Sequence, residues 1–315
     1  MNKSKLKIRF DQDFRQRGIW KYHQYLKVVP EKFRLSLDEG STAENYIKDL
    51  DVTFMREDQN PTGSLKDRGM AFLISKYFSE GKTDFVISSS GNAAISAANI
   101  CRQAGLNLVI FISPNIESGK LKIIKGFDFE IKITPSPLSQ SALFAFENGY
   151  VHLRPSTDIY GSEGYRTISF ELLSGDTNPD DIFIPVSSGS CFIGVFEGFS
   201  KLGFLPRFHL CQSSTINPVA RIFDADFIKE KNSLAGAIVA KVVPQKEKIV
   251  DIVKKSGGNG WVIDNNRISE AQKLLEKNGI FTSNEGALAF AAVIKAREKH
   301  QEPGKTVCLL TGKKY

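Results

Sequence analysis

The sequence predicts an α/β fold in which helices cover the faces of mostly parallel sheets. From about residue 65, short apolar runs alternate with segments whose apolar side chains recur every three or four residues. Alternation of this kind is typical of parallel sheets, because parallel strands need a crossover connection that is usually a helix. The 315 residues suffice for two domains, and 41% of them are hydrophobic, which is enough to build a core.

The individual elements follow from periodicity and from breakers. Apolar side chains between residues 70 and 78 fall at i, i+3, i+4, i+7 and i+8, which predicts a helix with one apolar face. A second helix is expected to end at Gly105, because glycine readily takes the left-handed conformation that closes helices. The expected strands are 85–87, 108–112, 129–133, 182–186, 208–211 and 307–310, and the expected helices are 70–78, 93–104, 121–125, 139–147, 192–202, 269–277 and 285–299.

Two loops of small polar residues are predicted at the ends of strands, where the ligands of parallel α/β folds bind. Ser88-Ser89-Ser90-Gly91-Asn92 follows one expected strand and opens a helix, and Ser187-Ser188-Gly189-Ser190-Cys191 follows another. Backbone N–H groups at a helix start bind carboxylate or phosphate, and small side chains let the backbone wrap around an anion. Taken alone, the first loop is equally consistent with an ordinary turn.

The loop 60–69 contains the most reactive candidate, Lys66. Its proline and glycine predict a rigid turn, and Thr62 or Ser64 can cap the helix that follows. Lys66 is then expected in the first helical turn, where the positive end of the helix dipole lowers the free-energy cost of a neutral amine. A lysine must become neutral to form a Schiff base. Thr311, after the last expected strand, can turn a hydroxyl toward a ring nitrogen.

Other chemistries find little support in the sequence. The histidines are isolated and the four cysteines are widely spaced without a CxxC pair, so we expect no metal site and reduced thiols in a cytoplasm. The net charge of +7 is spread along the chain without a nucleic-acid-binding motif, which favours a solvated basic surface. We expect no membrane span and no secretory signal, since no apolar run is long enough and the basic start lacks an apolar segment.

Taken together, these loops resemble those of the pyridoxal-phosphate (PLP) dependent enzymes of fold type II, the tryptophan synthase beta superfamily, and within it the threonine synthases. The string 60–69 resembles NPTGSFKDRG, with Leu65 in place of Phe, and is highly specific. The resemblance runs through most of the chain. The other matching strings are Gly18-Ile19-Trp20-Lys21-Tyr22, Ser36-Leu37-Asp38-Glu39-Gly40-Ser41-Thr42, Ser89-Ser90-Gly91-Asn92, Glu163-Gly164-Tyr165-Arg166-Thr167, Gly279-Ile280-Phe281 with Glu285-Gly286-Ala287, and Leu310-Thr311-Gly312.

The resemblance implies a fold, a cofactor and roles for single residues. The fold would comprise two three-layer α/β domains with twisted, mostly parallel sheets: a large PLP-binding domain of residues 1–81 and 151–315, and a small mobile domain of residues 82–150. Lys66 would form the Schiff base with PLP and shuttle protons. Asn92 would bind the 3-oxygen of PLP, and Thr311 would face its pyridine nitrogen. The PLP phosphate would be held by Ser187, Ser188, Gly189, Ser190 and Cys191, and the substrate carboxylate by Ser89, Ser90, Gly91 and Asn92.

The resemblance also implies an activity. A hydroxyl such as that of Thr311 leaves the pyridine nitrogen less protonated than a carboxylate would, which suits elimination and replacement chemistry. The chain would then be a cytoplasmic lyase of amino-acid biosynthesis that acts on the side chain of an amino acid. Conversion of O-phosphohomoserine to threonine and phosphate is the best-named candidate reaction, and a homodimer is the family-level expectation.

The sequence departs from the threonine synthases around the phosphate of the substrate. Ala93 stands where Thr usually follows SGN, and Gly161-Ser162 stands where an Arg often precedes the EGxKT string. Loss of an Arg and a Thr weakens a site for a dianion by several hydrogen bonds and a charge. Arg154 or Arg166 is available in the sequence to replace them.

Three alternatives stay open at this point. Another fold type II activity, a serine or threonine dehydratase or a β-replacement synthase in a specialised pathway, would use the same lysine. A catalytically silent paralogue would bind PLP or an amino acid as a sensor, although the intact Lys66 argues against it. Nucleic-acid binding, suggested by the positive charge alone, predicts salt-sensitive retention on DNA.

Overall fold

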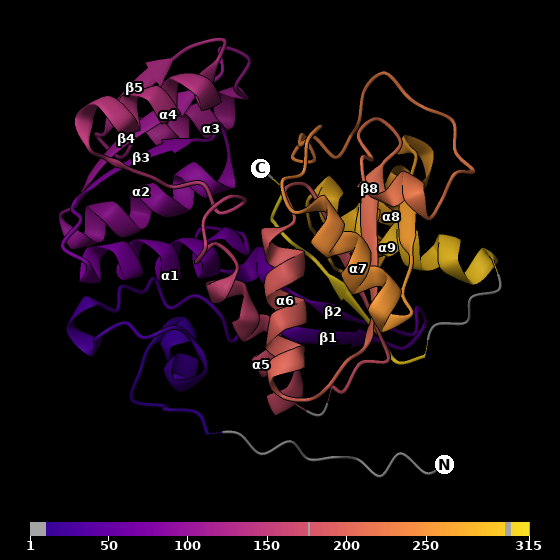
Figure 1. Cartoon of the computed structure of the whole chain (residues 1–315). Coiled ribbons are helices and arrows are strands. Elements are labelled where there is room, and N and C mark those ends of the chain that lie inside the picture. Colours follow the sequence, from indigo (N-terminus) through magenta and orange to yellow (C-terminus); the bar gives the residue numbers. More distant parts are fainter. Residues whose placement is uncertain (1–10, 176, 300–303, 315) are drawn as a thin grey trace.

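The computed structural model describes residues 11–175, 177–299 and 304–314, and it contains two sheets surrounded by helices (Figure 1). All strand pairings within these residues are parallel, except that the first two strands of the chain pair antiparallel. The predicted α/β fold with two mostly parallel sheets is therefore confirmed. The larger sheet has the order β1 (Glu44–Ile47), β2 (Val52–Met55), β10 (Thr306–Leu309), β7 (Asp181–Pro185), β8 (Arg207–Ser213) and β9 (Gly260–Ile263).

Helices cover both faces of the six-stranded sheet. One face packs on three helices through a core that includes Ile184 and Leu210, and the other packs on two helices through a core that includes Phe183 and Cys211. Neighbouring residues of a strand point to opposite faces, so Phe183 and Ile184 enter different cores. The three helices of the first face are α5 (Arg166–Ser174), α6 (Ser190–Lys201) and α7 (Lys246–Ser256), and those of the second are α8 (Asn265–Lys277) and α9 (Asn284–Glu298).

The four-stranded sheet is also covered on both faces. Phe85 and Ile87 face a core shared with helices α1 to α3, whereas Val86 packs against Ala145 of α4 on the other face. The strands come from residues 84–152, and a small mobile domain at 82–150 stays a prediction. The sheet has the order β5 (Glu130–Ile133), β4 (Asn107–Ile112), β3 (Asp84–Ser88) and β6 (Val151–His152), with helices α1 (Lys66–Ser79), α2 (Asn92–Ala104), α3 (Ser118–Lys125) and α4 (Pro137–Asn148).

The predicted helices and strands are all present, with ends that differ by a few residues. Helix α2 ends as predicted, because Gly105 takes a left-handed conformation with φ of 64°. Six elements were not predicted: β1, β2, β6, β9, α5 and α7. The structure also contains short 3₁₀ helices, which are η1 (Gly18–Tyr25), η2 (Glu31–Phe33), η3 (Glu57–Gln59), η4 (Glu163–Tyr165) and η5 (Ala220–Ile222).

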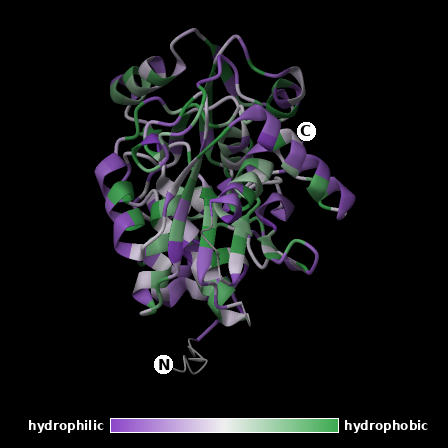
Figure 2. Ribbon diagram, turned by 90° about the vertical axis from the view of Figure 1, so that its right-hand side faces the viewer, coloured by the Kyte–Doolittle hydropathy of each residue, from purple (hydrophilic) through white to green (hydrophobic). Residues whose placement is uncertain are grey.

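Figure 2 shows purple and green alternating along the outer helices, as expected for helices with one buried and one solvated face. Among the residues that the structure describes, no helix is both long and apolar enough to cross a membrane.

One carboxyl group, that of Glu39, is fully buried where the N-terminal segment meets the body of the chain. Its side chain accepts hydrogen bonds from the backbone N–H groups of Leu37 (2.7 Å) and Ile19 (3.3 Å) and from the hydroxyl of Ser36 (3.0 Å). These donors are neutral, so burial dominates and raises the pKa of Glu39 to about 7. Glu39 therefore links η1 to the loop 36–42 by hydrogen bonds. Its carboxyl group becomes charged only near neutral pH.

We expect Glu39 to make the protein less stable as the pH rises from about 4.5 to about 7. In this range the unfolded chain releases the proton while the folded chain keeps it, so deprotonation favours unfolding, by an amount on the order of 3 kcal/mol. Urea unfolding across this pH range measures the loss. In Glu39→Gln the same loss is absent, whereas equal pH slopes in the two proteins would show that Glu39 titrates normally.

Candidate active site

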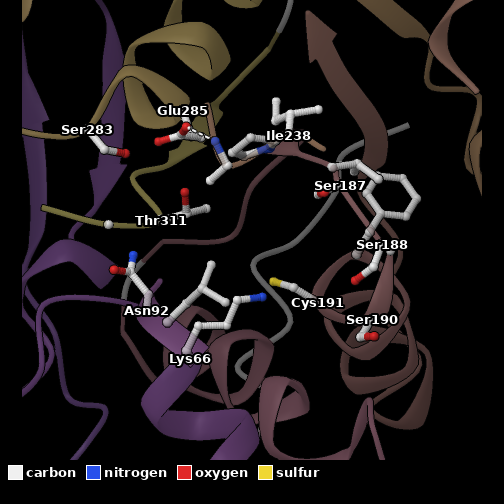
Figure 3. A pocket seen from close by; sticks show the side chains of 17 residues that line it. Lys66, Asn92, Ser187, Ser188, Ser190, Cys191, Ile238, Ser283, Glu285 and Thr311 are labelled. Atoms are coloured by element: carbon white, nitrogen blue, oxygen red, sulfur yellow. Dashed lines mark hydrogen bonds between the residues drawn. The ribbon is translucent and has the colours of Figure 1, made fainter. Parts of the chain in front are cut away.

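A cleft of about 640 Å³, including the solvent at its mouth, opens where β7 and β10 end (Figure 3). Helices α1, α2, α6 and α9 all begin at the cleft or beside it. The cleft is lined by every predicted cofactor-binding residue, namely Lys66, Asn92, Ser187, Ser188, Gly189, Ser190, Cys191 and Thr311.

The loop that carries Lys66 is tied to the C-terminal segment 311–313. The N–H of Leu65 donates to the carbonyl of Thr311 (3.1 Å), and the N–H of Lys313 donates to the carbonyl of Gly63 (2.8 Å). Gly63 has φ of +88°, a left-handed conformation that favours glycine. These bonds fix the start of α1, so that Lys66 is its first residue, as predicted, and lies on one wall of the cleft.

Of the two side chains predicted to cap α1, only that of Ser64 bonds to a backbone N–H of the helix. The hydroxyl of Ser64 accepts a hydrogen bond from the N–H of Lys66 at 3.3 Å. Thr62 does not cap the helix, because its hydroxyl donates to the carboxyl group of Asp67, which also accepts the N–H of Thr62 at 2.8 Å. Asp67 thereby closes the turn between Pro61 and the helix.

Burial governs the protonation of Lys66. Burial lowers the pKa of Lys66, and the nearby Cys191 opposes this only in part. The Nζ atom lies 5.9 Å from the centre of the Tyr165 ring. Burial likewise raises the pKa of Cys191 to about 12, so this thiol stays protonated. A lysine with a lowered pKa supplies the neutral amine that nucleophilic and proton-transfer chemistry needs.

The loop between β7 and α6 is a tight turn that leads directly into the helix. Gly189 has φ of +95°, and a Cβ atom there would lie 2.4 Å from Cδ1 of Ile249. Ser190 starts α6, so the first-turn N–H groups of this helix have no acceptor within it. The buried hydroxyl of Ser190 has no hydrogen-bond partner among the described residues. The hydroxyl of Ser187 accepts from the N–H of Val239 at 3.2 Å, which ties the turn to a neighbouring loop.

The serine-rich loop before α2 meets the cleft only through Asn92. The Oδ1 atom of Asn92 is buried and has no hydrogen-bond partner among the described residues. The hydroxyl of Ser89 instead accepts the N–H of Gly91 (3.3 Å), and that of Ser90 accepts the N–H of Ser113 (3.1 Å). Ser89, Ser90 and Gly91 are not among the cleft-lining residues, so the structure brings the predicted cofactor residues together but leaves these three beside them.

The lining residues that sequence reasoning did not assign to the site include Ala237, Ile238, Ser283 and Glu285. Glu285 accepts the N–H of Ala237 at 2.8 Å, which holds the irregular segment around residue 237 against the start of α9. The hydroxyl of Ser283 is buried without a hydrogen-bond partner among the described residues. Glu285 belongs to the string Glu285-Gly286-Ala287, which resembles the family. Its place in that string is the sequence signal by which it could have been identified as a site residue.

The guanidinium of Arg68 is the centre of a hydrogen-bond network that links several of the family-like sequence strings near the cleft. It is fully buried, and it donates to both oxygens of Glu57 (2.7 Å each), both oxygens of Glu171 (2.8 and 2.7 Å) and the hydroxyl of Thr167 (2.9 Å). All five N–H donors of the side chain are therefore used. Although burial alone lowers the pKa of Arg68, the charges of Glu171 and Glu57 raise it well above its ordinary value.

The two carboxylates extend this network to the other strings. Glu57 accepts the hydroxyl of Thr42 (2.8 Å) and the amide of Asn60 (2.8 Å), and Glu171 accepts the N–H of Ser41 (2.9 Å). The strings 36–42, 60–69 and 163–167 thus share one buried cluster of hydrogen bonds.

The arginines considered for a substrate phosphate lie elsewhere. Arg166 pairs with Glu163 (2.9 Å) and Glu197 (2.8 Å) and does not line the cleft, and neither does Arg154. Gly161 leaves no room for a larger residue, because a Cβ atom there would lie 1.9 Å from the carbonyl oxygen of Pro155. Among the described residues that line the cleft, Lys66 is the only lysine or arginine.

Within residues 11–175, 177–299 and 304–314, no group of three or more His, Cys, Asp or Glu side chains is arranged to hold a metal ion.

Comparison with known proteins gives consistent results. The family model described as "Pyridoxal-phosphate dependent enzyme" matches residues 37–312. The chain is 28% identical to the threonine synthase of Methanocaldococcus jannaschii over 95% of its own length and 80% of the relative's. It is 30% identical to the threonine synthase of a Bacillus species, covering 92% and 87% of the two chains. It is also 26% identical to the catabolic L-threonine dehydratase TdcB of Staphylococcus aureus, covering 81% and 77%.

Solved structures share the fold. Maize serine racemase matches with a TM-score of 0.77 at 22% identity, covering 87% of this chain and 88% of the racemase. The processed threonine deaminase isoform 2 of Solanum lycopersicum matches with a TM-score of 0.77 at 16% identity, covering 97% and 91%. At these identities the likeness establishes the fold alone.

We expect Arg68→Lys to destabilise the fold by about 3–5 kcal/mol, because a lysine has three donors and cannot pair two buried carboxylates in bidentate fashion. The free energy of unfolding in urea measures the effect. The matched control is Arg15→Lys, since Arg15 pairs with Asp13 on the surface and is 89% exposed. Equal stabilities of the two variants would contradict the importance of the buried network.

Proposed function

Because the chain belongs to the family of pyridoxal-phosphate-dependent enzymes, we propose that it removes or replaces a leaving group on the side chain of an amino acid, with Lys66 as the residue that carries the cofactor. The family and fold type II architecture imply pyridoxal 5′-phosphate as the cofactor. The observation that carries the proposal is the cleft in which Lys66, the loop 187–191, Asn92 and Thr311 converge.

The residues of the cleft fit the polar groups of PLP. The first turn of α6, with the unpartnered hydroxyl of Ser190, suits a phosphate group. The NH2 group of Asn92 can donate to the 3-oxygen, and the hydroxyl of Thr311 suits the pyridine nitrogen. The buried Oδ1 atom of Asn92 has no partner among the described residues. Buried polar atoms without partners are rare in proteins, so their convergence here supports a polar ligand at this place.

When bound, PLP supplies an electron sink that stabilises negative charge on the carbon atoms of an amino acid. Lys66 would take and return protons at the substrate's α and β carbons, for which its lowered pKa is suited. The N–H groups at the start of α2, in the loop Ser89-Ser90-Gly91-Asn92, would hold the substrate carboxylate. Movement of residues 82–150 toward the cleft would exclude water.

Threonine synthase is the best-named candidate activity, because relatives of that name align with more than nine-tenths of the chain. O-Phosphohomoserine would then yield threonine and phosphate. Dehydration of serine or threonine is the second candidate. It is favoured by the charges of the cleft, since Arg166 is held by Glu163 and Glu197 and no arginine is among the lining residues. An amino-acid substrate, a cytoplasmic setting and a homodimer belong to the same proposal.

The assay that tests the proposal offers a panel of amino acids to the PLP-reconstituted protein. Threonine and inorganic phosphate are expected from O-phosphohomoserine, and turnover should fall by roughly 100- to 10,000-fold or more in Lys66→Ala. The control is Lys254→Ala, an exposed lysine of α7. Release of a 2-oxo acid from serine or threonine, without phosphate release, would select the dehydratase instead. Bound cofactor without turnover of any substrate would contradict an enzymatic function.

A further inference from the structure

Tyr165 does not line the cleft, but it lies next to the residue that does the chemistry there. It is the last residue of η4, which packs against both α1 and α6, and its side chain is fully buried. The Nζ atom of Lys66 lies over the face of its ring, 5.9 Å from the ring centre. The string EGxKT, which this segment resembles, leaves the position of Tyr165 open, and the function proposed above does not use it.

Two glycines make room for the side chain of Tyr165. A Cβ atom on Gly69 of α1 would lie 2.5 Å from both the Cζ atom and the hydroxyl oxygen of Tyr165. A Cβ atom on Gly194 of α6 would lie 2.8 Å from the Cβ atom of Tyr165. Residues three positions apart on a helix are neighbours on one face, so the hydroxyl lies against the face of α1 that carries Lys66, one turn further along.

The hydroxyl of Tyr165 is buried without a hydrogen-bond partner among the described residues. Buried polar groups are normally paired, so an unpaired one indicates a partner that reaches it in another state of the protein. Burial raises the pKa of this hydroxyl, and Cys191 and Asp67 raise it further, so it stays neutral. Within the described part of the chain, the amine of Lys66 likewise forms no hydrogen bond or ion pair. Two unpaired polar groups therefore lie on the same face of α1.

The other titratable groups around Lys66 are neutral or already engaged. They are Cys191 of α6, which lies beside the amine in Figure 3, Asp67 of α1, Glu57 of η3, and Glu285 of α9 on the far side of the cleft. Each of the three carboxylates accepts hydrogen bonds from other groups of the fold. The thiol keeps its proton, because burial raises its pKa to about 12. The charged form of Lys66 thus has no carboxylate partner among the described residues.

We propose that Tyr165 is a positioning residue for Lys66, whose amine is held by the face of the ring and by the hydroxyl oxygen whenever it carries a proton. A ring face attracts a cation, and a phenolic oxygen accepts a hydrogen bond from an ammonium group. The inference deepens the proposed function and rests on it, since a lysine that takes and returns protons alternates between its neutral and charged forms. Burial favours the neutral amine and Tyr165 favours the charged one, so both forms remain accessible.

The test measures the proton affinity of Lys66 in the full chain without cofactor. A trace of acetic anhydride acetylates only neutral amines, and mass spectrometry of the digested protein gives the pH at which Lys66 is half reactive, with the exposed Lys254 as internal reference. Tyr165→Phe keeps the ring and removes one oxygen atom, so we expect this midpoint to fall by about one pH unit, a loss of proton affinity of about tenfold. Tyr150→Phe removes a hydroxyl on the α4 side of the four-stranded sheet and should leave the midpoint unchanged.

The outcomes separate this inference from the proposed function. An unchanged or raised midpoint in Tyr165→Phe overturns the inference, because the hydroxyl then does not stabilise the charged amine. Loss of folding in this variant overturns it as well, since the hydroxyl would then serve the structure of the core. Failure of the wild type to take up PLP would instead contradict the proposed function, and it would leave the midpoints, which are measured without cofactor, as they are.

Discussion

The buried guanidinium of Arg68 is the interaction on which the geometry of the cleft depends. It lies two residues after Lys66 on α1 and uses all five of its donors within the fold. Its partners, Glu57 and Glu171, come from segments more than a hundred residues apart in the sequence. A buried charge is tolerated only when it is fully paired, so the loops that supply these partners must assemble together. The start of α1, and with it Lys66, is thereby fixed relative to α5.

A second constraint acts on the same loop from the other side. The carbonyl groups of Gly63 and Thr311 accept hydrogen bonds across the contact between the loop 60–69 and the C-terminal segment. The start of α1 is therefore fixed by two sets of contacts. One is the charged network of Arg68, and the other is the pair of backbone hydrogen bonds to the segment 311–313. Such support keeps the amine in one position within a partly desolvated cleft, which is the condition for an effective base or nucleophile.

Much of this arrangement was predictable from the sequence, because parallel strands deliver their following loops to one edge of a sheet. The turn 187–191 and the helix start at Asn92 were found in this way. Helix α5 was not predicted because its residues Thr167–Leu173 are all buried. A fully buried helix lacks the periodic apolar pattern of a half-exposed helix. Helix α7 did carry a signal in Ile249, Ile252 and Val253, and it was overlooked. The cleft residues Ala237 and Ile238 belong to an irregular segment without any periodic pattern.

The directions of side chains were the other feature that the sequence did not predict. Arg166 lies within a string that resembles the family, yet it pairs with Glu163 and Glu197 and does not line the cleft. The hydroxyls of Ser89 and Ser90 likewise accept backbone N–H groups nearby. Sequence proximity to a motif gives the position of a residue but not the partner that its side chain finds.

The central claim, that Lys66 carries the cofactor, is tested most directly by chemical trapping. Sodium borohydride reduces the imine between a lysine and the aldehyde of PLP to a permanent bond, and mass spectrometry of the digested protein then locates the modified residue. The account predicts one stoichiometric phosphopyridoxyl group on the peptide that contains Lys66. Stoichiometric labelling of any other lysine, or no labelling of protein saturated with PLP, would contradict it.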